Sequence, residues 1–258
     1  VATYETSLYD EWGVKRKDFG LADLFGVSFA GKNEGPMRNA YLRLEHESAR
    51  GHPLLRGLED APRIAHGVWR VDVKPAAPVG AVAPLTLIPS YPDLPMEKVY
   101  ARQPRTDIAQ VFLREVPGSA ATPGRIVYFP WDIDRSFWEM LGVDHGRLMA
   151  NAVAWASRDD SPIVVRGPGI IDVAVWQQKN SFTVHLVNLT NPMMMKGPIR
   201  EVIPLGAQKV TLHLPAGARA RAVKLLVANT TPQFRQTRGT IEVEVPGIGE
   251  HEVVAVDV

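Results

Sequence analysis

The sequence predicts an α/β region followed by an all-β sandwich, and two observations divide the chain of 258 residues near residue 158. Seventeen of the twenty Phe, Trp and Tyr residues lie in residues 1–158, whereas Val occurs 14 times before this point and 16 times in the shorter remainder. The first part alternates helical and extended patterns, as layered α/β domains do. The second part carries only strand signals separated by Pro and Gly turns.

The elements of residues 1–158 follow from apolar spacing and turn residues. Phe19, Ala22 and the pair Leu24/Phe25 are at the spacing of a helix that Gly26 would end. Asp144 is a suitable N-cap for a later helix. The predicted helices are Lys17–Phe25, Arg135–Leu141 and Asp144–Ala156, and the predicted strands are Asn39–Glu45, Ile64–Val73, Ile108–Val116 and Gly124–Pro130.

Residues 159–258 follow a polar segment, Ser157–Pro162, which ends in proline and is typical of a linker. Glu242 and Glu244 alternate with Ile241 and Val243, the pattern of an antiparallel sheet with one buried face. Seven short strands of this kind favour a sandwich. They are Ile163–Val165, Ile170–Gln177, Ser181–Leu189, Gln208–Leu214, Ala222–Val227, Thr240–Val245 and Glu250–Val256.

Composition excludes several classes of protein. The net charge is only +1, which disfavours a nucleic-acid or anionic-membrane partner. Cysteine is absent, so disulfides, thiolate metal sites and a cysteine nucleophile are excluded, and we expect a cytoplasmic location. No apolar run is long enough for a transmembrane helix. The chain starts at Val1 inside an apparent strand without a signal peptide, so we expect a fragment of a longer polypeptide.

Known catalytic motifs fit poorly. Gly26–Ala30 resembles a nucleophile elbow around Ser28, but a helix precedes it where a strand is required. Residues 26–33 resemble a phosphate-binding loop with Asn33 in place of Ser or Thr, and no helix can follow through Gly35–Pro36. The seven histidines show no metal-ligand spacing, so we expect neither a metal nor a cofactor. We interpret Met193–Met195 as an interface rather than a copper site.

Two acidic-aromatic segments are the candidate contact residues. Each directly follows a short apolar strand, and the carboxyl ends of parallel strands meet at one edge of a sheet. Carboxylates beside aromatic rings suit the hydroxyls and ring faces of sugars. In the alternative interpretation, Asp134 caps a helix and the aromatic residues fill the core or an interface. The candidates are Glu5, Tyr9, Trp12, Trp131, Asp132, Asp134 and Arg135.

Long segments resemble the trimerisation domain of β-galactosidase-like glycoside hydrolases, those of family 42 and α-L-fucosidase-like relatives. They are VATYETSLYDEWGVKRKDFGLADLFGV (1–27), HPLLRG (52–57), GRIVYFPWDID (124–134) and DHGRLMANAVAWA (144–156). VHLVNLTNPMMMKGPIREVIPLG (184–206) and HEVVAVD (251–257) resemble the β domain that ends such chains. The resemblance therefore spans nearly the whole chain, and its segments are diagnostic of accessory domains rather than of a reaction.

The resemblance implies an incomplete glutamine-amidotransferase-like, flavodoxin-like layered domain in residues 1–158, lacking its first strands, and an antiparallel β-sandwich domain in residues 159–258. In such proteins the catalytic carboxylates belong to a preceding (β/α)₈ barrel, for which this chain has no room. We therefore expect a non-catalytic portion that serves self-association, as a trimer by resemblance, and that helps to complete a carbohydrate site. The alternatives are a stand-alone carbohydrate-binding module and a small esterase-like hydrolase with an unrecognised Ser/His/Asp set.

Overall fold

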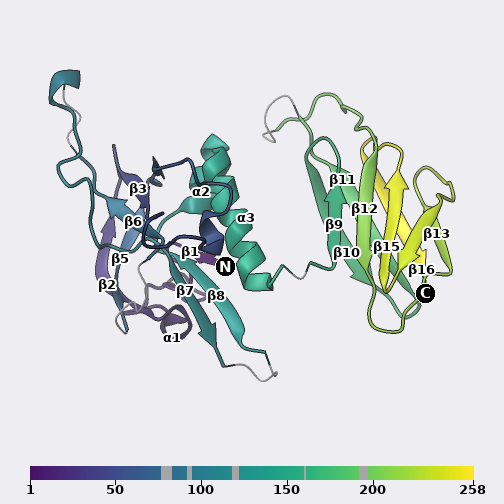
Figure 1. The fold of residues 1–258 in the computed structure, drawn as a ribbon, viewed down its shortest axis with the longest axis horizontal. Helices are drawn as coiled ribbons and strands as arrows, with labels where there is room; N and C mark the ends of the chain where they lie inside the picture. Colours follow the sequence, from purple (N-terminus) through teal and green to yellow (C-terminus); the bar gives the residue numbers. More distant parts are fainter. Residues whose placement is uncertain (77–82, 92–94, 118–121, 160, 192–196) are drawn as a thin grey trace. The chain divides into compact units, whose positions relative to one another are not determined.

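The structure, a computed structural model, describes residues 1–76, 83–91, 95–117, 122–159, 161–191 and 197–258. The chain divides into two compact units, Val1–Asp160 and Ser161–Val258, each with its own hydrophobic core (Figure 1). Met193–Met195, which we expected at an interface, and Asp160 of the expected linker lie outside the described residues.

The first unit holds three small sheets. Their strand orders are β1-β8-β7, β2-β5 and β4-β3-β6, and among the residues that the structure describes only β1 and β8 pair in parallel. A register shift interrupts the β2–β5 pair between Phe29 and Asn33. The strands are β1 (Ala2–Thr3), β2 (Val27–Glu34), β3 (Tyr41–Leu44), β4 (Arg63–Ala65), β5 (Arg70–Pro75), β6 (Leu85–Ile88), β7 (Phe112–Val116) and β8 (Gly124–Phe129).

This unit is therefore a mixed α/β structure, as expected at that level, and among its described residues the parallel pairing is confined to β1 and β8 while the other strand pairs are antiparallel. The physical reason is connection length. Parallel neighbours require a crossover of a dozen or more residues, usually a helix, whereas short turns join antiparallel strands. The two longer helices, α2 (Ile133–Met140) and α3 (Val143–Ser157), both follow β8, which is the last strand of the unit.

The helices differ from the sequence expectation at their starts. The first predicted helix shortens to α1 (Ala22–Phe25), because Asp18 Oδ1 accepts the N–H groups of Phe19 and Phe29 and holds the preceding residues in a turn. Gly26 ends α1 in the left-handed conformation, at φ 71°. The residue that precedes α3 is Gly142, so the expected cap Asp144 is wrong. The 3₁₀ turns are η1 (Pro53–Leu55) and η2 (Met96–Lys98).

The core of the first unit has two clusters. In one, Leu148 and Ala152 of α3 pack with Val127 and Phe129 of β8 and with Trp131. In the other, aromatic rings pack around Tyr128, and the ring of Phe25 stacks on it with centroids 4.4 Å apart. Alternate residues of β8 thus face different clusters, which fixes the segment after β8 firmly in the unit.

The second unit consists of two four-stranded antiparallel sheets, in the orders β10-β11-β16-β13 and β14-β15-β12-β9. Their apolar side chains share one cluster, consistent with the predicted sandwich. All seven predicted strands are present, and Phe234–Thr237 (β14) was missed because Phe234 is its single apolar residue. The others are β9 (Ile163–Arg166), β10 (Ile171–Gln177), β11 (Ser181–Asn188), β12 (Gln208–His213), β13 (Ala222–Leu225), β15 (Thr240–Val245) and β16 (His251–Asp257).

Candidate functional site

The parallel pair β1–β8 brings the two acidic-aromatic segments to one edge. Ala2 lies opposite Tyr128, Thr3 lies opposite Phe129, and Tyr4 N donates to Phe129 O at 2.8 Å. Both segments therefore leave at the carboxyl ends of neighbouring strands, as the sequence predicted. Their first residues are also electrostatically close, because the charge of Asp132 contributes to raising the pKa of Tyr4, after burial and the Glu5 carboxylate.

A small hydrogen-bond cluster begins the first segment. Tyr9 Oη donates to Glu5 Oε1 at 3.3 Å, and the amide of Asn33 on β2 donates to the same oxygen. Tyr128 Oη donates to the carbonyl of Tyr4 at 2.7 Å, and burial raises the pKa of this phenol. The cluster holds the Glu5 carboxylate in place. Sequence analysis missed Asn33, because nothing in the local pattern links β2 to residues 28 positions earlier.

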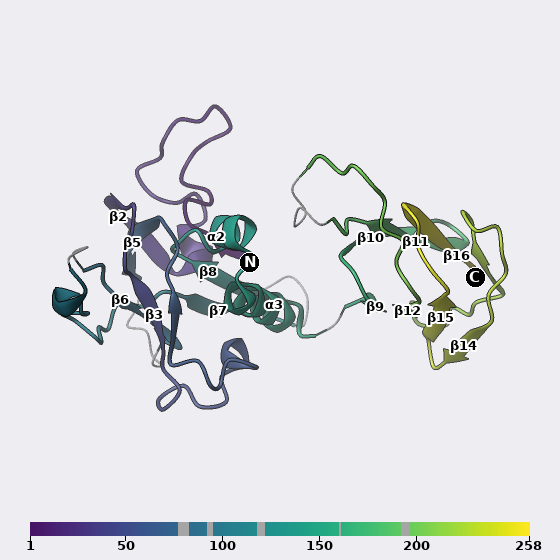
Figure 2. The same ribbon diagram turned by 90° about the horizontal axis from the view of Figure 1, so that it is seen from above.

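Residues 9–16 form a projecting hairpin that we call the arm, and Figure 2 shows the segment between β1 and α1 standing out from the unit. A bridge joins Tyr9 to Lys15, and Asp10 Oδ1 accepts the N–H groups of Trp12 and Val14 at 3.0 and 2.8 Å. The preceding residue, Leu8, is completely buried and anchors the arm. The indole of Trp12 is 85% exposed at the turn, so the arm presents a large ring on a hydrogen-bonded support.

Trp131 and Asp132 have a different environment. The Trp131 side chain is completely buried, and its Nε1 donates to Gln110 O at 3.1 Å. Asp132 Oδ1 accepts the N–H of Trp69 at 3.0 Å, and burial raises the pKa of this carboxyl above its ordinary value. In the folded chain, these two side chains are therefore not accessible to a sugar, either for stacking or for a hydrogen bond. For Trp131 the structure agrees with the core alternative.

Asp134 and Arg135 remain exposed on the first turn of α2. Arg135 Nε lies 2.9 Å from Glu139 Oε1, and this hydrogen bond is the main cause of the raised pKa of the guanidinium. The residue in the cap position of α2 is Asp132, whose side chain makes no cap hydrogen bond, so Asp134 is not the helix cap. The exposed candidates at this edge are thus Asp134 and Arg135, with Tyr9 and Trp12 on the arm.

The side-chain types of a hydrolase triad also occur in the interior. Asp132, Ser136 and His145 lie around Gly67 and Trp131, and all three are almost completely buried. His145 Nε2 lies 3.0 Å from Ala65 O, while Ser136 Oγ and His145 Nδ1 have no hydrogen-bond partner. Burial lowers the pKa of His145. Because substrate cannot reach these atoms in the folded chain, the esterase alternative gains no support from them.

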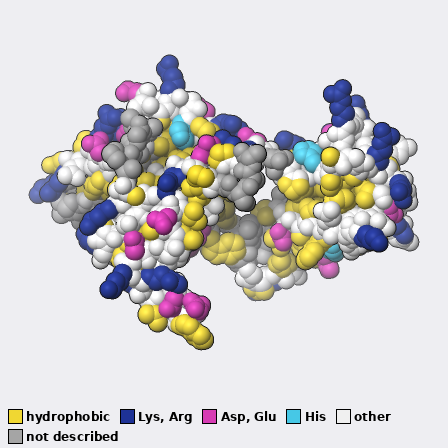
Figure 3. All heavy atoms as spheres, turned by 90° about the horizontal axis from the view of Figure 1, so that it is seen from below, with side chains coloured by type: hydrophobic (Ala, Val, Ile, Leu, Met, Phe, Trp, Pro, Cys, Tyr) yellow, Lys and Arg dark blue, Asp and Glu magenta, His cyan; other side chains and the backbone are white. Residues whose placement is uncertain are grey.

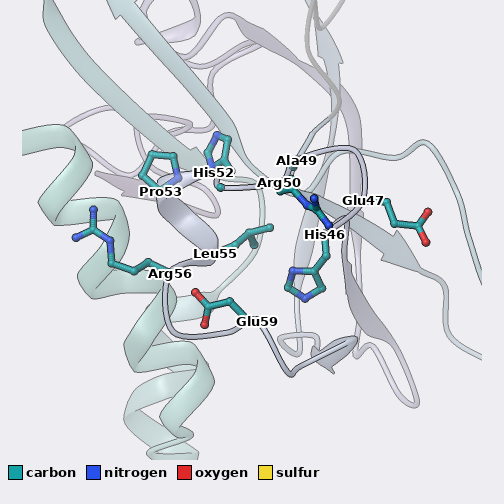
Figure 4. A pocket seen from close by; sticks show the side chains of 10 residues that line it. His46, Glu47, Ala49, Arg50, His52, Pro53, Leu55, Arg56 and Glu59 are labelled. Atoms are coloured by element: carbon teal, nitrogen blue, oxygen red, sulfur yellow. The ribbon is translucent and has the colours of Figure 1, made fainter.

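A separate cavity of about 610 Å³ lies between the loop after β3 and η1 (Figure 4). The side chains of His46 and Glu59 face it, with Leu55 between them, whereas Arg56 and Glu47 point away. The polar groups are already engaged by their own loop, because His46 Nε2 lies 2.8 Å from Ala61 O and Glu59 Oε1 accepts Gly57 N at 2.9 Å. His46 and Glu59 are therefore already satisfied within their own loop.

Other site chemistries find no support in the part of the chain that the structure describes. There, no cluster of three His, Asp or Glu side chains is arranged to hold a metal ion. No helix among the same residues has the length and hydrophobicity needed to cross a membrane. Basic and acidic side chains are interspersed on the face shown in Figure 3, which gives no single-sign surface for a polyanion.

No protein-family model matches the sequence, and no curated protein matches it. The fold is similar to the C-terminal part of α-L-fucosidase isoenzyme 2 from Paenibacillus thiaminolyticus, with a TM-score of 0.58 and 17% identity. That match covers 90% of this chain and 33% of the fucosidase, so the chain spans about one third of its length. The likeness confirms the predicted resemblance at the level of the fold.

Two β-galactosidases match with lower scores. The enzyme from Rahnella sp. R3 has a TM-score of 0.49 and 14% identity, over 100% of this chain and 28% of that one. A GH42 β-galactosidase from G. stearothermophilus has a TM-score of 0.48 and 13% identity, over 99% of this chain and 27% of that one.

Proposed function

We propose that this chain is the non-catalytic C-terminal portion of a glycoside hydrolase-like protein, and that its first unit serves self-association and helps to complete a carbohydrate site. The similarity in fold to one third of an α-L-fucosidase supports the assignment to such a protein. The assignment of residues 1–158 as a trimerisation-like domain that lacks its first strands, followed by a β domain from residue 159, is part of the same proposal.

The arm is the main structural support for the proposed role in assembly. A Trp side chain buries a large area when it docks, and such anchors dominate binding energy. Trp12 is 85% exposed, and the hydrogen bonds that Asp10 accepts from Trp12 N and Val14 N fix the turn before any partner binds. A pre-ordered support lowers the entropy that binding loses. An exposed ring on a firm, projecting hairpin is therefore suited to a protein surface, such as a neighbouring subunit or a catalytic barrel.

The sugar contact would use the exposed residues of the same edge. Tyr9 and Trp12 offer aromatic rings, and Asp134 and Arg135 offer a hydrogen-bond acceptor and donors, respectively. In this proposal Trp131 and Asp132 act indirectly, because their burial fixes the start of α2, where Asp134 and Arg135 lie. Glu5 acts in the same way through its hydrogen bond with Tyr9.

The test uses the longer parent protein with Trp12→Ala, and with Trp138→Ala as a matched control. Trp138 lies on α2 of the same unit and is 50% exposed. We expect Trp12→Ala to weaken assembly, measured by light scattering, and to raise the Michaelis constant more than it lowers turnover, as lost uniform binding does. Unchanged assembly and an unchanged Michaelis constant for Trp12→Ala would contradict the role of the arm.

The chain alone should release no product from aryl galactosides or fucosides, because glycoside hydrolysis requires two carboxyl groups placed on either side of the bond. Turnover that disappears with Asp134→Ala would instead assign catalysis to this chain. The exposure of Trp12 also suits a stand-alone carbohydrate-binding module. A glycan-binding screen of the chain alone distinguishes this second candidate from the proposed accessory portion, since only a stand-alone module binds a glycan without the rest of the parent.

A further inference from the structure

The four strands at the edges of the sandwich are unequal. β9, β13 and β14 have four residues each and carry Arg166, Lys224 and Arg235, respectively. β10 has seven residues, and Asp172 is its single charged residue. Short length and basic side chains protect an edge strand from pairing with other chains, whereas a long, weakly charged edge invites it. β10 is therefore the edge that lacks the usual protection.

The hydrogen bonds that flank β10 show which of its backbone groups are free. Leu189 N donates to Ile170 O at 2.9 Å, and Gln178 N donates to Ser181 O at 2.8 Å. The register between these points is continuous, and hydrogen-bonded and non-hydrogen-bonded pairs alternate along antiparallel strands. The even-numbered residues of β10 therefore bond to β11. The odd-numbered residues, Ile171, Val173, Val175 and Gln177, direct their N–H and C=O groups to the open edge.

We propose that β10 pairs antiparallel with β10 of a second copy of this chain, about a twofold axis at Ala174. In this register Ile171 lies opposite Gln177 of the other copy, and Val173 lies opposite Val175. These are the residues whose backbone groups are free, so each pair is hydrogen-bonded and about eight bonds form across the axis. The strand is thus complementary to itself in its backbone pattern.

The side chains fit the same register. Ile171, Val173 and Val175 are half-buried. Ile171 and Val173 line a cavity of about 230 Å³ between the sheets, together with Ile163 and Val165 of β9. A second β10 extends this apolar row and covers the open side of the sandwich. On the outer face, Trp176 is 63% exposed and lies opposite Asp172 of the other copy. Asp172, the single charged residue of the strand, therefore does not lie opposite Asp172 of the other copy.

Ala174 meets itself at the axis. This is a non-hydrogen-bonded pair, in which the Cα atoms approach to about 4.5 Å and the side chains are closest. The small, exposed methyl group of Ala174 permits that approach. A second copy is therefore a better occupant than an unrelated strand, because charge, size and backbone pattern all match under the twofold rotation. The surface lies in the second unit and is separate from the arm.

The first experiment uses the absence of cysteine from the chain. Ala174→Cys introduces the only thiol, and the expected Cα separation lies within the range for a disulfide. Mild oxidation of the full chain should convert it largely to a disulfide-linked dimer on a non-reducing gel. Ala222→Cys, at an exposed position on the opposite edge strand β13, is the matched control. Equal cross-linking of the two variants would overturn the proposal.

The second experiment uses charge. Ala174→Lys and Ala174→Glu each place like charges face to face at the axis, and each should weaken the dimer by up to about fivefold in sedimentation equilibrium. An equimolar mixture of the two variants should restore dimerisation, because opposite charges then meet. Ala222→Lys should leave the dimer unchanged. Variants that retain the wild-type association, or a mixture that shows no recovery, would contradict the twofold pairing. Trp12→Ala tests the arm independently, and β10 pairing should survive it.

Discussion

Gly67 is the position where one added carbon should disturb the candidate edge most. A β-carbon at this residue would lie 2.8 Å from Trp131 Cε3 and 2.9 Å from Ser136 Oγ, and closer still to Asp132 Oδ1. These neighbours are all buried, so they cannot swing into solvent. The backbone of Gly67 is not in the left-handed region, so the effect of Gly67→Ala comes from this overlap alone.

The expected loss of stability has two parts. Overpacking of a closed core costs about 1–3 kcal/mol. Displacement of the Asp132 carboxylate also breaks its 3.0 Å hydrogen bond with Trp69 N, which leaves a buried donor unpaired at a cost of about 1–3 kcal/mol. The free energy of unfolding of the first unit should therefore fall by about 2–6 kcal/mol in total.

Urea denaturation followed by tryptophan fluorescence measures this loss, since five of the six Trp residues lie in the first unit. Gly124→Ala is the control, because its added carbon would be no closer than 3.4 Å to any neighbour. A double-mutant cycle with Asp132→Ala isolates the overlap with the carboxylate. Gly67→Ala should cost less when Asp132 is already truncated. Strictly additive effects, or a loss no larger than that of Gly124→Ala, would refute the reasoning.

Three further predictions concern titratable side chains. Glu252→Ala removes the carboxylate that accepts the backbone N–H groups of Val227, Ala228 and Val253. In urea denaturation this change should destabilise the second unit by about 2–4 kcal/mol. The control, Glu250→Ala at an exposed position, should change stability by less than about 0.5 kcal/mol. Burial acts to raise the pKa of Glu34, but its contacts with Lys32 and Arg70 outweigh burial and hold the pKa below the ordinary 4.5. The stability that these contacts supply is present above pH 4.5 and is lost as the pH falls through the lowered pKa. Glu34→Gln should therefore reduce the loss of stability at acid pH, measured by denaturation. Burial lowers the pKa of His145 below 6.5. As the pH drops below 6.5, the unfolded chain therefore takes up a proton at this residue before the folded chain does, and stability should fall. A urea midpoint that depends on pH equally in His145→Gln would contradict this.

Local sequence patterns were enough to predict most of the second unit and the common edge of the first. Alternation of Val and Ile with Glu along a strand depends only on neighbouring residues, because successive side chains point to opposite faces. Every strand with that alternation was therefore predictable, and β14, which has only Phe234 as an apolar residue, was not. The two acidic-aromatic segments could be placed at one edge because each follows an apolar strand.

The tertiary structure alone decided which strands pair and which side chains are buried. Local periodicity does not specify a strand's partner, so the expected parallel sheet reduced to the single pair β1–β8. Trp12 and Trp131 look alike in sequence, each beside carboxylates after a strand, yet one is 85% exposed and the other completely buried. Their difference arises from α3 and the segment around Gly67, which close over Trp131, whereas the described residues of the first unit leave Trp12 on the arm largely exposed. Burial is a property of contacts distant in sequence, and only the folded chain supplies them.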